Sequence, residues 1–180
     1  MKQFFIILIS IFSLNANAQI SQVTIQASGL TCSMCSNAIN KSLKKLSYVD
    51  QVKSNIKNST FEITFSKPAL VNFDQLKKKV EDAGFFVARF DVTMDFNKAE
   101  VKNDTHLNIG GVFYHFLNTK ELLLNGTKKI QLLDKGYVTN KEFKKNAIYT
   151  KMNCYHTGVM GSCCSKNGSH TGTRIYHVTI

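Results

Sequence analysis

Two cysteines, Cys32 and Cys35, lie three residues apart in the sequence Gly-Leu-Thr-Cys-Ser-Met-Cys. The residues before Cys32 alternate between apolar and polar, as in a strand, and the residues after Cys35 follow a helical pattern. The pair is therefore expected where a strand gives way to the N-terminus of a helix. The exposed N–H groups and the positive dipole end of a helix favour the thiolate form of a nearby cysteine. Two thiolates at this spacing predict a site for a soft metal ion.

The coordination chemistry of sulfur favours Cu(I) at such a pair. Cu(I) is a soft ion that two sulfur ligands can hold, whereas Zn(II) ordinarily takes four ligands in a closed site. Two ligands leave an opening through which a thiolate of another protein can attack, so the ion can be passed on by ligand exchange. Mercury, cadmium and zinc are also compatible with two thiolates. Met34 offers a thioether, but we expect it to be an exposed loop residue.

The same Cys-x-x-Cys pattern also occurs in structural disulfides and in redox-active pairs of the thioredoxin type. Both fit less well, because the chain has no tryptophan ahead of Cys32 and its one proline is Pro68. In an oxidising compartment, metal-free protein would still form a disulfide between Cys32 and Cys35 unless reductant or metal arrived first.

The residues around the cysteine pair predict six elements in the order strand, helix, strand, strand, helix, strand. Alternating apolar residues predict the strands, and apolar residues at helical spacing predict the helices. Asn72 and Gln75 resemble the capped start of the second helix, which Gly84 ends. The expected strands cover residues 23–29, 49–56, 61–65 and 86–92, and the expected helices cover residues 35–46 and 73–83. This order is that of an α+β, ferredoxin-like domain with both helices on one face of an antiparallel sheet.

Residues 20–94 resemble the heavy-metal-associated domain of copper chaperones, copper-pump N-terminal modules and periplasmic mercury-binding proteins. Leu30 stands where this family usually has methionine, and we expect its side chain to point into the core. The resemblance implies a ferredoxin-like domain that binds Cu(I), or another soft ion, between Cys32 and Cys35. The residues that carry it are Gly29-Leu30-Thr31-Cys32-x-x-Cys35 with Ile39, Val49 in the second strand, and Ala83-Gly84-Phe85 after the second helix.

The first 18 residues have the layout of a secretory signal peptide. Lys2 precedes an apolar run at residues 4–14, and Ala16 and Ala18 supply small residues for a cleavage site. The run is too short to span a bilayer comfortably, and no other stretch approaches the roughly 20 apolar residues that a membrane helix requires. We therefore expect a periplasmic or secreted protein that starts at Gln19 and has no membrane span.

The chain is basic, with 23 basic and 12 acidic residues and a net charge of +11. Removal of Lys2 with the signal peptide leaves 22 basic residues and a net charge of +10 (22 − 12). The lysines do not alternate with aromatic residues as they do in many nucleic-acid-binding proteins. We therefore expect a solvated basic surface and no nucleic-acid partner.

The second half is expected to be a separate small β-rich domain at residues 105–180, joined to the first domain (residues 19–95) by a polar linker at residues 96–104. Asn125-Gly126 predicts a hairpin turn, and Thr139 with Glu142 predicts a capping box for a short helix ending near residue 147. The expected strands lie at residues 107–117, 122–124, 130–133, 148–152 and 173–180. This order suits a partly open barrel such as an OB-fold.

Three more cysteines and several histidines gather late in the chain. Their spacing permits a second metal site that combines thiolate and imidazole ligands. The alternative is a disulfide from Cys154 to Cys163 or Cys164, although an odd number of cysteines leaves one thiol over and so favours metal. His106 and His115 are expected to be ordinary strand residues. The candidate ligands are Cys154, His156, Cys163, Cys164 and His170, with His177 in the closing strand.

These patterns predict a metal carrier that is not an enzyme. Its first domain would exchange Cu(I) with a metal donor or acceptor protein, such as a copper-pump domain, while the second domain would dock or supply further ligands. The alternatives are a thiol-disulfide oxidoreductase that uses the same cysteine pair, and a secreted module that buffers metal passively.

Overall fold

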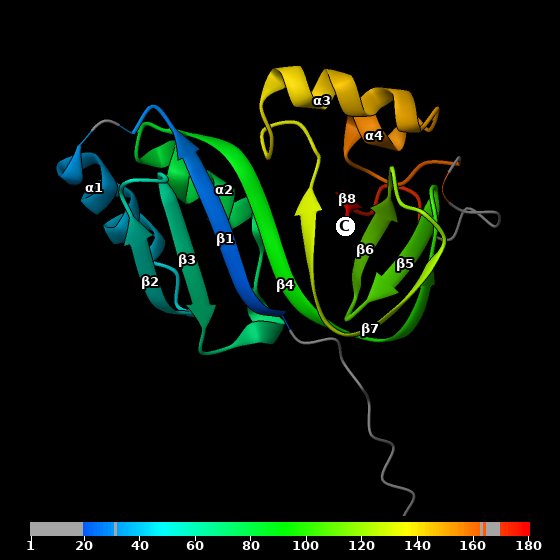
Figure 1. Cartoon of the computed structure of the whole chain (residues 1–180), viewed down its shortest axis with the longest axis horizontal. Coiled ribbons are helices and arrows are strands. Elements are labelled where there is room, and N and C mark those ends of the chain that lie inside the picture. Colours follow the sequence, from blue (N-terminus) through cyan, green and yellow to red (C-terminus); the bar gives the residue numbers. More distant parts are fainter. Residues whose placement is uncertain (1–19, 31, 163, 165–169) are drawn as a thin grey trace, which may run out of the picture.

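The strands of the computed structural model form one mixed sheet (Figure 1). The structure describes residues 20–30, 32–162, 164 and 170–180, so the expected signal peptide at residues 1–18 lies outside the described residues. Eight strands lie in the order β2-β3-β1-β4-β7-β8-β6-β5. The elements of the first half are β1 (Ile20–Ser28), α1 (Ser33–Leu43), β2 (Val49–Asn55), β3 (Thr60–Phe65), η1 (Pro68–Leu70), α2 (Phe73–Asp82) and β4 (Phe86–Val101). The elements of the second half are β5 (Thr105–Ile109), β6 (Val112–Phe116), β7 (Leu122–Leu132), α3 (Asn140–Asn146), η2 (Ala147–Tyr149), α4 (Cys154–Thr157) and β8 (Ile175–Thr179).

The first half has the predicted βαββαβ order. β1 lies between β3 and β4 and is antiparallel to both, and β2 pairs with the outer side of β3. α1 and α2 pack together, and the hydroxyl of Ser42 donates a hydrogen bond to the carbonyl of Lys79 at 2.7 Å. The ferredoxin-like arrangement expected for this half is confirmed. Its core contains Val23, Ile25, Ile39, Leu43, Phe61, Ile63, Leu76 and Val80.

Local sequence signals set the ends of the second helix. The side chain of Asn72 accepts a hydrogen bond from the backbone N–H of Gln75 at 3.0 Å, which satisfies one of the free donors at the start of α2. Gly84 follows the C-terminus of the helix with φ +87°, a conformation that glycine adopts without steric cost.

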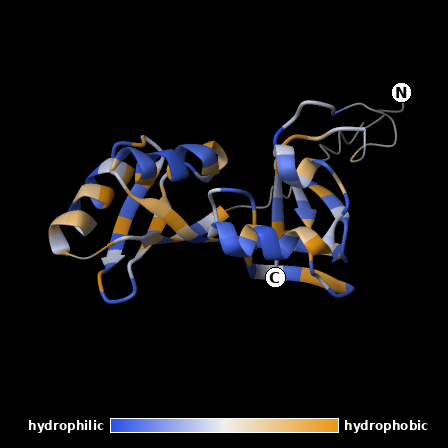
Figure 2. Ribbon diagram, turned by 90° about the horizontal axis from the view of Figure 1, so that it is seen from above, coloured by the Kyte–Doolittle hydropathy of each residue, from blue (hydrophilic) through white to orange (hydrophobic). Residues whose placement is uncertain are grey.

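Hydrophobic and hydrophilic residues alternate along the strands of both halves (Figure 2), as expected for strands with one face in the core.

The linker expected at residues 96–104 is wrong for residues 96–101, because β4 continues to Val101. This extension pairs with β7 from Asp91 opposite Gln131 to Val101 opposite Leu122. The register shifts between Phe96 and Ala99, which marks a bulge. The polar residues of the bulge suggested a linker, although the strand resumes beyond them. The two halves therefore share one strand, and independent folding of each stays a prediction.

The second half differs from its expected strands at three places. Residues Asn125 and Gly126 do not form a hairpin turn but lie inside β7, where Gly126 is paired with Phe96 at the bulge of β4. The apolar run at residues 107–117 is divided into β5 and β6 by a turn at Gly110 and Gly111, both with positive φ. Residues 148–152 form no strand, since η2 covers the first two of them.

Two other expectations for the second half are confirmed. α3 begins with the capping box of Thr139 and Glu142, and β8 lies within the expected final strand. β8 is antiparallel to β7 and parallel to β6. The strand order is linear, with β2 and β5 at its two ends, so the expected OB-like barrel is not confirmed.

Asp74, in the first turn of α2, joins the two halves. Its carboxylate accepts hydrogen bonds from Tyr137 at 2.6 Å, Tyr176 at 2.9 Å and Arg174 at 3.1 Å, all from the second half. Partial burial raises the pKa of this carboxyl, but the hydrogen bonds from Arg174 and Tyr137 outweigh it, so the pKa lies below the ordinary value of 3.8. The ionised form of Asp74 therefore stabilises the contact between the halves.

We expect Asp74→Asn to lower the free energy of unfolding at pH 7 by about 1–2 kcal/mol. The loss is smaller than for a fully buried charged group, because this carboxylate is partly exposed to solvent. Because the folded pKa is depressed, the stabilisation is present above pH 3.8 and is lost as the pH falls through the folded pKa. Urea unfolding at pH 7 and near pH 3 measures both effects, and the variant should lose less stability than the wild type between them.

The control is Asp82→Asn, which alters an exposed carboxylate at the other end of the same helix. It should leave the stability nearly unchanged. An Asp74→Asn protein as stable as the wild type at pH 7 would contradict the assigned role.

Candidate metal centre

The sulfurs of Cys32 and Cys35 face each other at the N-terminus of α1. Their Sγ atoms are 2.9 Å apart, and the backbone N–H of Cys35 donates a hydrogen bond to the Sγ of Cys32 at 3.4 Å. Cys32 is the N-cap residue of the helix and has an extended backbone, so its side chain lies over the first helical turn. The structure thus brings the two sulfurs together, and their role as metal ligands stays a prediction.

The packing of β1 and α1 holds the pair in place. Ala27 is buried near the end of β1, and Gly29 then turns the chain with φ +80°, which a residue with a side chain rarely adopts. Leu30 packs against the core, as expected for the position where the resembled family has methionine. Ile39 and Leu43 are fully buried and fix α1 on the sheet. The two sulfurs therefore lie between two anchored elements.

The two thiols differ in their access to solvent. Cys32 is exposed and Cys35 is partly buried, while the side chain of Met34 between them is 81% exposed, as expected. Hydrogen bonding from Cys35, through its side chain first and its backbone N–H second, lowers the pKa of the Cys32 thiol. Because the thiolate is the form that binds metal, Cys32 is the more reactive ligand of the pair.

The separation of the two sulfurs suits a single shared ion. Two metal–sulfur bonds of about 2.3 Å can bridge sulfurs up to about 4.6 Å apart. The observed 2.9 Å lies within that limit, so a small rotation of either side chain is enough to admit an ion. The spacing of the pair is therefore compatible with one shared soft ion.

A comparison with protein families identifies this region. The model of the heavy-metal-associated domain matches residues 24–86, about a third of the chain, and both cysteines lie inside the match. Residues 24–86 form a heavy-metal-associated domain. This family is defined by metal binding and is not an enzyme family.

The curated relatives are much longer proteins than this chain. The chain is 28% identical over 132 residues to "Copper-transporting ATPase 2" of Rattus norvegicus, which covers 63% of this chain and 9% of that protein. It is 35% identical over 75 residues to "Copper-exporting P-type ATPase" of Staphylococcus saprophyticus, which covers 41% of this chain and 9% of that protein. The chain thus spans about a tenth of the length of these relatives, which are enzymes as whole proteins.

Solved structures match somewhat more than a third of the chain. A putative copper-ion-binding protein from Bacillus anthracis is 35% identical, with 38% of this chain and 94% of that chain covered and a TM-score of 0.35. Oxidized MerP from Ralstonia metallidurans is 28% identical, with 37% and 92% covered and a TM-score of 0.35. Both TM-scores lie below 0.5, so no statement about the whole chain follows from either likeness.

Outside the heavy-metal-associated domain, the structure separates the late residues that the sequence grouped as a second site. Cys154 is buried at the start of α4, whereas His156 is exposed. Cys164 is partly buried and packs against the cluster that contains Cys154, and the exposed His170 lies with its ring centroid 4.9 Å from that of Phe113. Neither His156 nor His170 belongs to the group of metal-ligating side chains found around Cys154 among the described residues.

Among the described residues, Cys154 is thus grouped with His106 and His115 and not with His156 or His170. Cys163 lies outside the described residues, so the alternative disulfide from Cys154 to Cys163 or Cys164 stays a prediction.

Sequence reasoning missed the histidines that surround Cys154. His106 and His115 do lie in strands, as expected, but they are paired directly across β5 and β6. Their ligand atoms and the sulfur of Cys154 all lie within 4.8 Å of one another. The turn at Gly110 and Gly111 was the available signal, because a two-residue hairpin at this point places residue 106 opposite residue 115.

The surroundings of the two paired histidines favour the neutral form of their side chains. Burial, followed by the neighbouring charges of His106 and His177, lowers the pKa of His115 to about 3. Burial likewise lowers the pKa of His106. A neutral imidazole has a free lone pair, which is the form that ligates metal.

None of the described helices combines the length and the hydrophobicity needed to cross a bilayer.

The exposed position and lowered pKa of Cys32 predict selective alkylation. With limiting iodoacetamide at neutral pH, the reduced protein should be modified first at Cys32, because the thiolate is the reactive form. Peptide mass spectrometry after short reaction times gives the order of modification. Cys35→Ala should slow the reaction of Cys32 several-fold, since it removes the side chain that lowers the pKa.

Met34→Ala is the matched control, because this side chain lies between the two cysteines and is exposed. Its reaction rate should equal that of the wild type. Faster modification of Cys35 than of Cys32 would contradict the assignment.

Proposed function

We propose that this chain is an exported carrier that holds Cu(I) between Cys32 and Cys35 and passes the ion to a partner protein by ligand exchange. The observation that supports the proposal most directly is the pair of sulfurs, 2.9 Å apart at the exposed start of α1, within a heavy-metal-associated domain. The copper named in the descriptions of the related ATPases supports the choice of ion.

The donor set of this pair favours Cu(I) over Zn(II). In the part of the chain that the structure describes, the group of three or more cysteine, histidine or carboxylate ligands lies around Cys154, not beside Cys32 and Cys35. Zn(II) ordinarily needs four ligands, whereas soft thiolates select Cu(I), for which two are enough. Mercury and cadmium are also soft and share this preference, so the choice among these ions rests on the relatives.

Ligand exchange follows from the low number of ligands. A thiolate of the partner forms a bond to the copper ion, and the bond from Cys32 or Cys35 then breaks, so the ion stays bound to sulfur throughout. Cys32 is the more exposed of the two, and a partner therefore reaches the ion from its side. The released thiolate remains at the N-terminus of α1, where the free N–H groups and the helix dipole stabilise it.

We also propose that the chain acts in the periplasm or outside the cell, on the basis of the signal-like first 18 residues. There a bound ion would protect the pair from oxidation to a disulfide. The partner would be a metal donor or acceptor that itself offers thiolates, such as a copper-pump domain.

Loss of either cysteine should abolish tight copper binding. Under anaerobic, reducing conditions, competition with a chromophoric Cu(I) chelator should show one tight site. Cys32→Ser and Cys35→Ser should each weaken the Cu(I) affinity of this site. The loss should exceed the roughly 10–100-fold that is typical when a metal ligand loses only its hydrogen-bond partner. Each protein should also carry Cys154→Ala, Cys163→Ala and Cys164→Ala, so that no cysteine elsewhere in the chain contributes.

Met34→Ala provides the control and should retain the tight site. Unaltered copper retention in Cys32→Ser would refute carriage by this pair, and efficient reduction of insulin by the wild type would favour the oxidoreductase alternative.

Transfer kinetics separate a carrier from a passive buffer. The copper-loaded chain is mixed with increasing concentrations of a copper-free heavy-metal-associated domain, and the arrival of copper on that acceptor is followed over time. A carrier predicts a rate that rises in proportion to acceptor concentration, since the acceptor attacks the bound ion. A rate that does not change with acceptor concentration would mean that copper dissociates first, as a buffer requires.

A further inference from the structure

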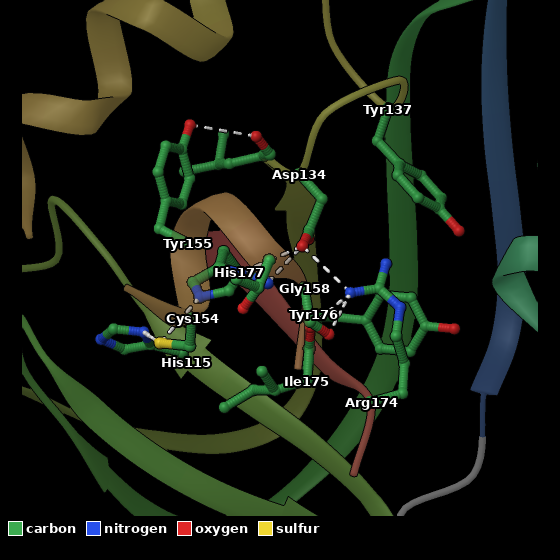
Figure 3. A network of polar contacts seen from close by, with 12 residues as sticks. His115, Asp134, Tyr137, Cys154, Tyr155, Gly158, Arg174, Ile175, Tyr176 and His177 are labelled. Atoms are coloured by element: carbon green, nitrogen blue, oxygen red, sulfur yellow. Dashed lines mark hydrogen bonds and ion pairs between the residues drawn. The ribbon is translucent and has the colours of Figure 1, made fainter. Parts of the chain in front are cut away.

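A second cluster of metal-ligating side chains lies in the core of the other half, remote in sequence from the cysteine pair. Cys154 of α4 lies between His115 of β6 and His177 of β8 (Figure 3). His106 of β5 stacks on His115, with ring centroids 4.1 Å apart. The side chains of Cys154, His115 and His177 are at most 1% exposed, so this polar cluster is removed from water.

The distances around the sulfur are those of a coordination site. The Sγ of Cys154 lies 3.4 Å from Nε2 of His177 and 3.6 Å from Nδ1 of His115. In a tetrahedral zinc site with bonds of about 2.1 Å to nitrogen and 2.3 Å to sulfur, the nitrogen and sulfur ligands are about 3.6 Å apart. The sulfur therefore lies at ligand distance from each of the two imidazole nitrogens.

Two carboxylates orient the imidazoles towards the sulfur. Asp104 lies 3.0 Å from Nε2 of His115, and Asp134 lies 3.0 Å from Nδ1 of His177. Each carboxylate accepts a hydrogen bond from the protonated ring nitrogen that faces it. The opposite ring nitrogens, which face Cys154, therefore carry lone pairs. A thiol has one hydrogen and can donate it to one of these two lone pairs only. A carboxylate behind each ligating histidine is the arrangement that accompanies bound metal in proteins.

His106 supplies a further donor. Its Nε2 is buried and has no hydrogen-bond partner among the described residues, a situation that is rare for a buried nitrogen. Its ligand atom belongs to the same group as those of His115 and Cys154, all within 4.8 Å of one another. A metal ion between these side chains would satisfy the nitrogen that the protein leaves without a partner.

We propose that Cys154, His106 and His115, whose ligand atoms lie within 4.8 Å of one another, bind one divalent transition-metal ion, and that this ion is Zn(II). His177, whose Nε2 lies 3.4 Å from the same sulfur, would become the fourth ligand by a shift of its side chain when the ion binds. One thiolate and three imidazoles form a closed four-ligand set of nitrogen and sulfur, which suits Zn(II) in a structural site. The ion would tie α4 to β5, β6 and β8 and so hold the end of the chain on the sheet. The ion at this site would have a structural role, unlike an ion at the exposed cysteine pair. A buried and fully ligated ion is not accessible to the thiolate of a partner protein, so ligand exchange does not remove it.

Burial argues against catalysis by the same residues. Cys154, His177 and Asp134 lie in the order of a nucleophile, a base and an orienting carboxylate. However, the neighbouring cavity is lined by Asp134, Tyr155 and Arg174 but not by Cys154. A substrate in that cavity would reach the carboxylate and not the sulfur, so a metal ligand is the better assignment.

The test uses the full chain with Cys32→Ser and Cys35→Ser, which leaves the first site without sulfur. Co(II) is the probe, since its tetrahedral complexes absorb visible light and its bond to thiolate adds a charge-transfer band in the near ultraviolet. We expect one Co(II) per chain with both features, displacement of Co(II) by one equivalent of Zn(II), and a higher melting temperature with Zn(II) bound.

Four variants in the same background identify the ligands. Cys154→Ala should remove the charge-transfer band, and His106→Gln should weaken Zn(II) binding while altering a side chain that is only partly buried. Asp104→Asn should weaken binding by roughly 10–100-fold through the orientation of His115; asparagine tolerates the positive φ of 63° at this position. His156→Gln, an exposed histidine of the same short helix, is the control and should bind as the parent does.

Three results would overturn the proposal. They are the absence of a sulfur charge-transfer band in the parent, the persistence of that band in Cys154→Ala, and a disulfide at Cys154 in the protein as isolated. Binding of Cu(I) at Cys154 without binding of Co(II) or Zn(II) would overturn the assignment to zinc. If Cys154→Ala fails to fold by circular dichroism, unchanged Zn(II) affinity in both His106→Gln and Asp104→Asn would serve as the refutation.

Discussion

The pairing of β4 on both of its edges is the constraint on which the rest of the structure depends. Residues 91–94 of this strand are hydrogen-bonded to β1 on one side and to β7 on the other. Because the backbone groups of this stretch are satisfied in both directions, the two halves cannot rotate about it without breaking two ladders. The edge that a four-stranded ferredoxin-like sheet would expose is thereby covered by the second half.

A chain of charged contacts reinforces this shared strand and leads towards the buried cluster. Arg174 contacts Asp74 at 3.1 Å on one side and Asp134 at 3.2 Å on the other, and Asp134 in turn contacts His177. The guanidinium thus lies between a carboxylate of the first half and the carboxylate that orients a histidine beside Cys154. One arginine therefore serves both the contact between the halves and the geometry of the buried cluster.

The two groups of candidate metal ligands occupy opposite environments, and their proposed roles differ accordingly. Cys32 and Cys35 lie at a helix start in contact with solvent, where the thiolate is stabilised and a partner can approach. Cys154, His115 and His177 lie in the core, where burial favours the neutral form of His115 and excludes competing ligands. The first arrangement suits an ion in transit and the second suits an ion that stays.

The sequence by itself determined the first half almost completely, because its elements follow one another closely and each carries its own local signal. The alternation of β1, the Asn72 cap of α2 and the Cys-x-x-Cys spacing are all readable within a few residues. Only the tertiary structure decided the path of β4 through residues 96–101, since a bulge interrupts the alternation that marks a strand. It also decided the partners of Cys154, because His115 and His177 come from β6 and β8, whose parallel pairing is a long-range contact that no local pattern records.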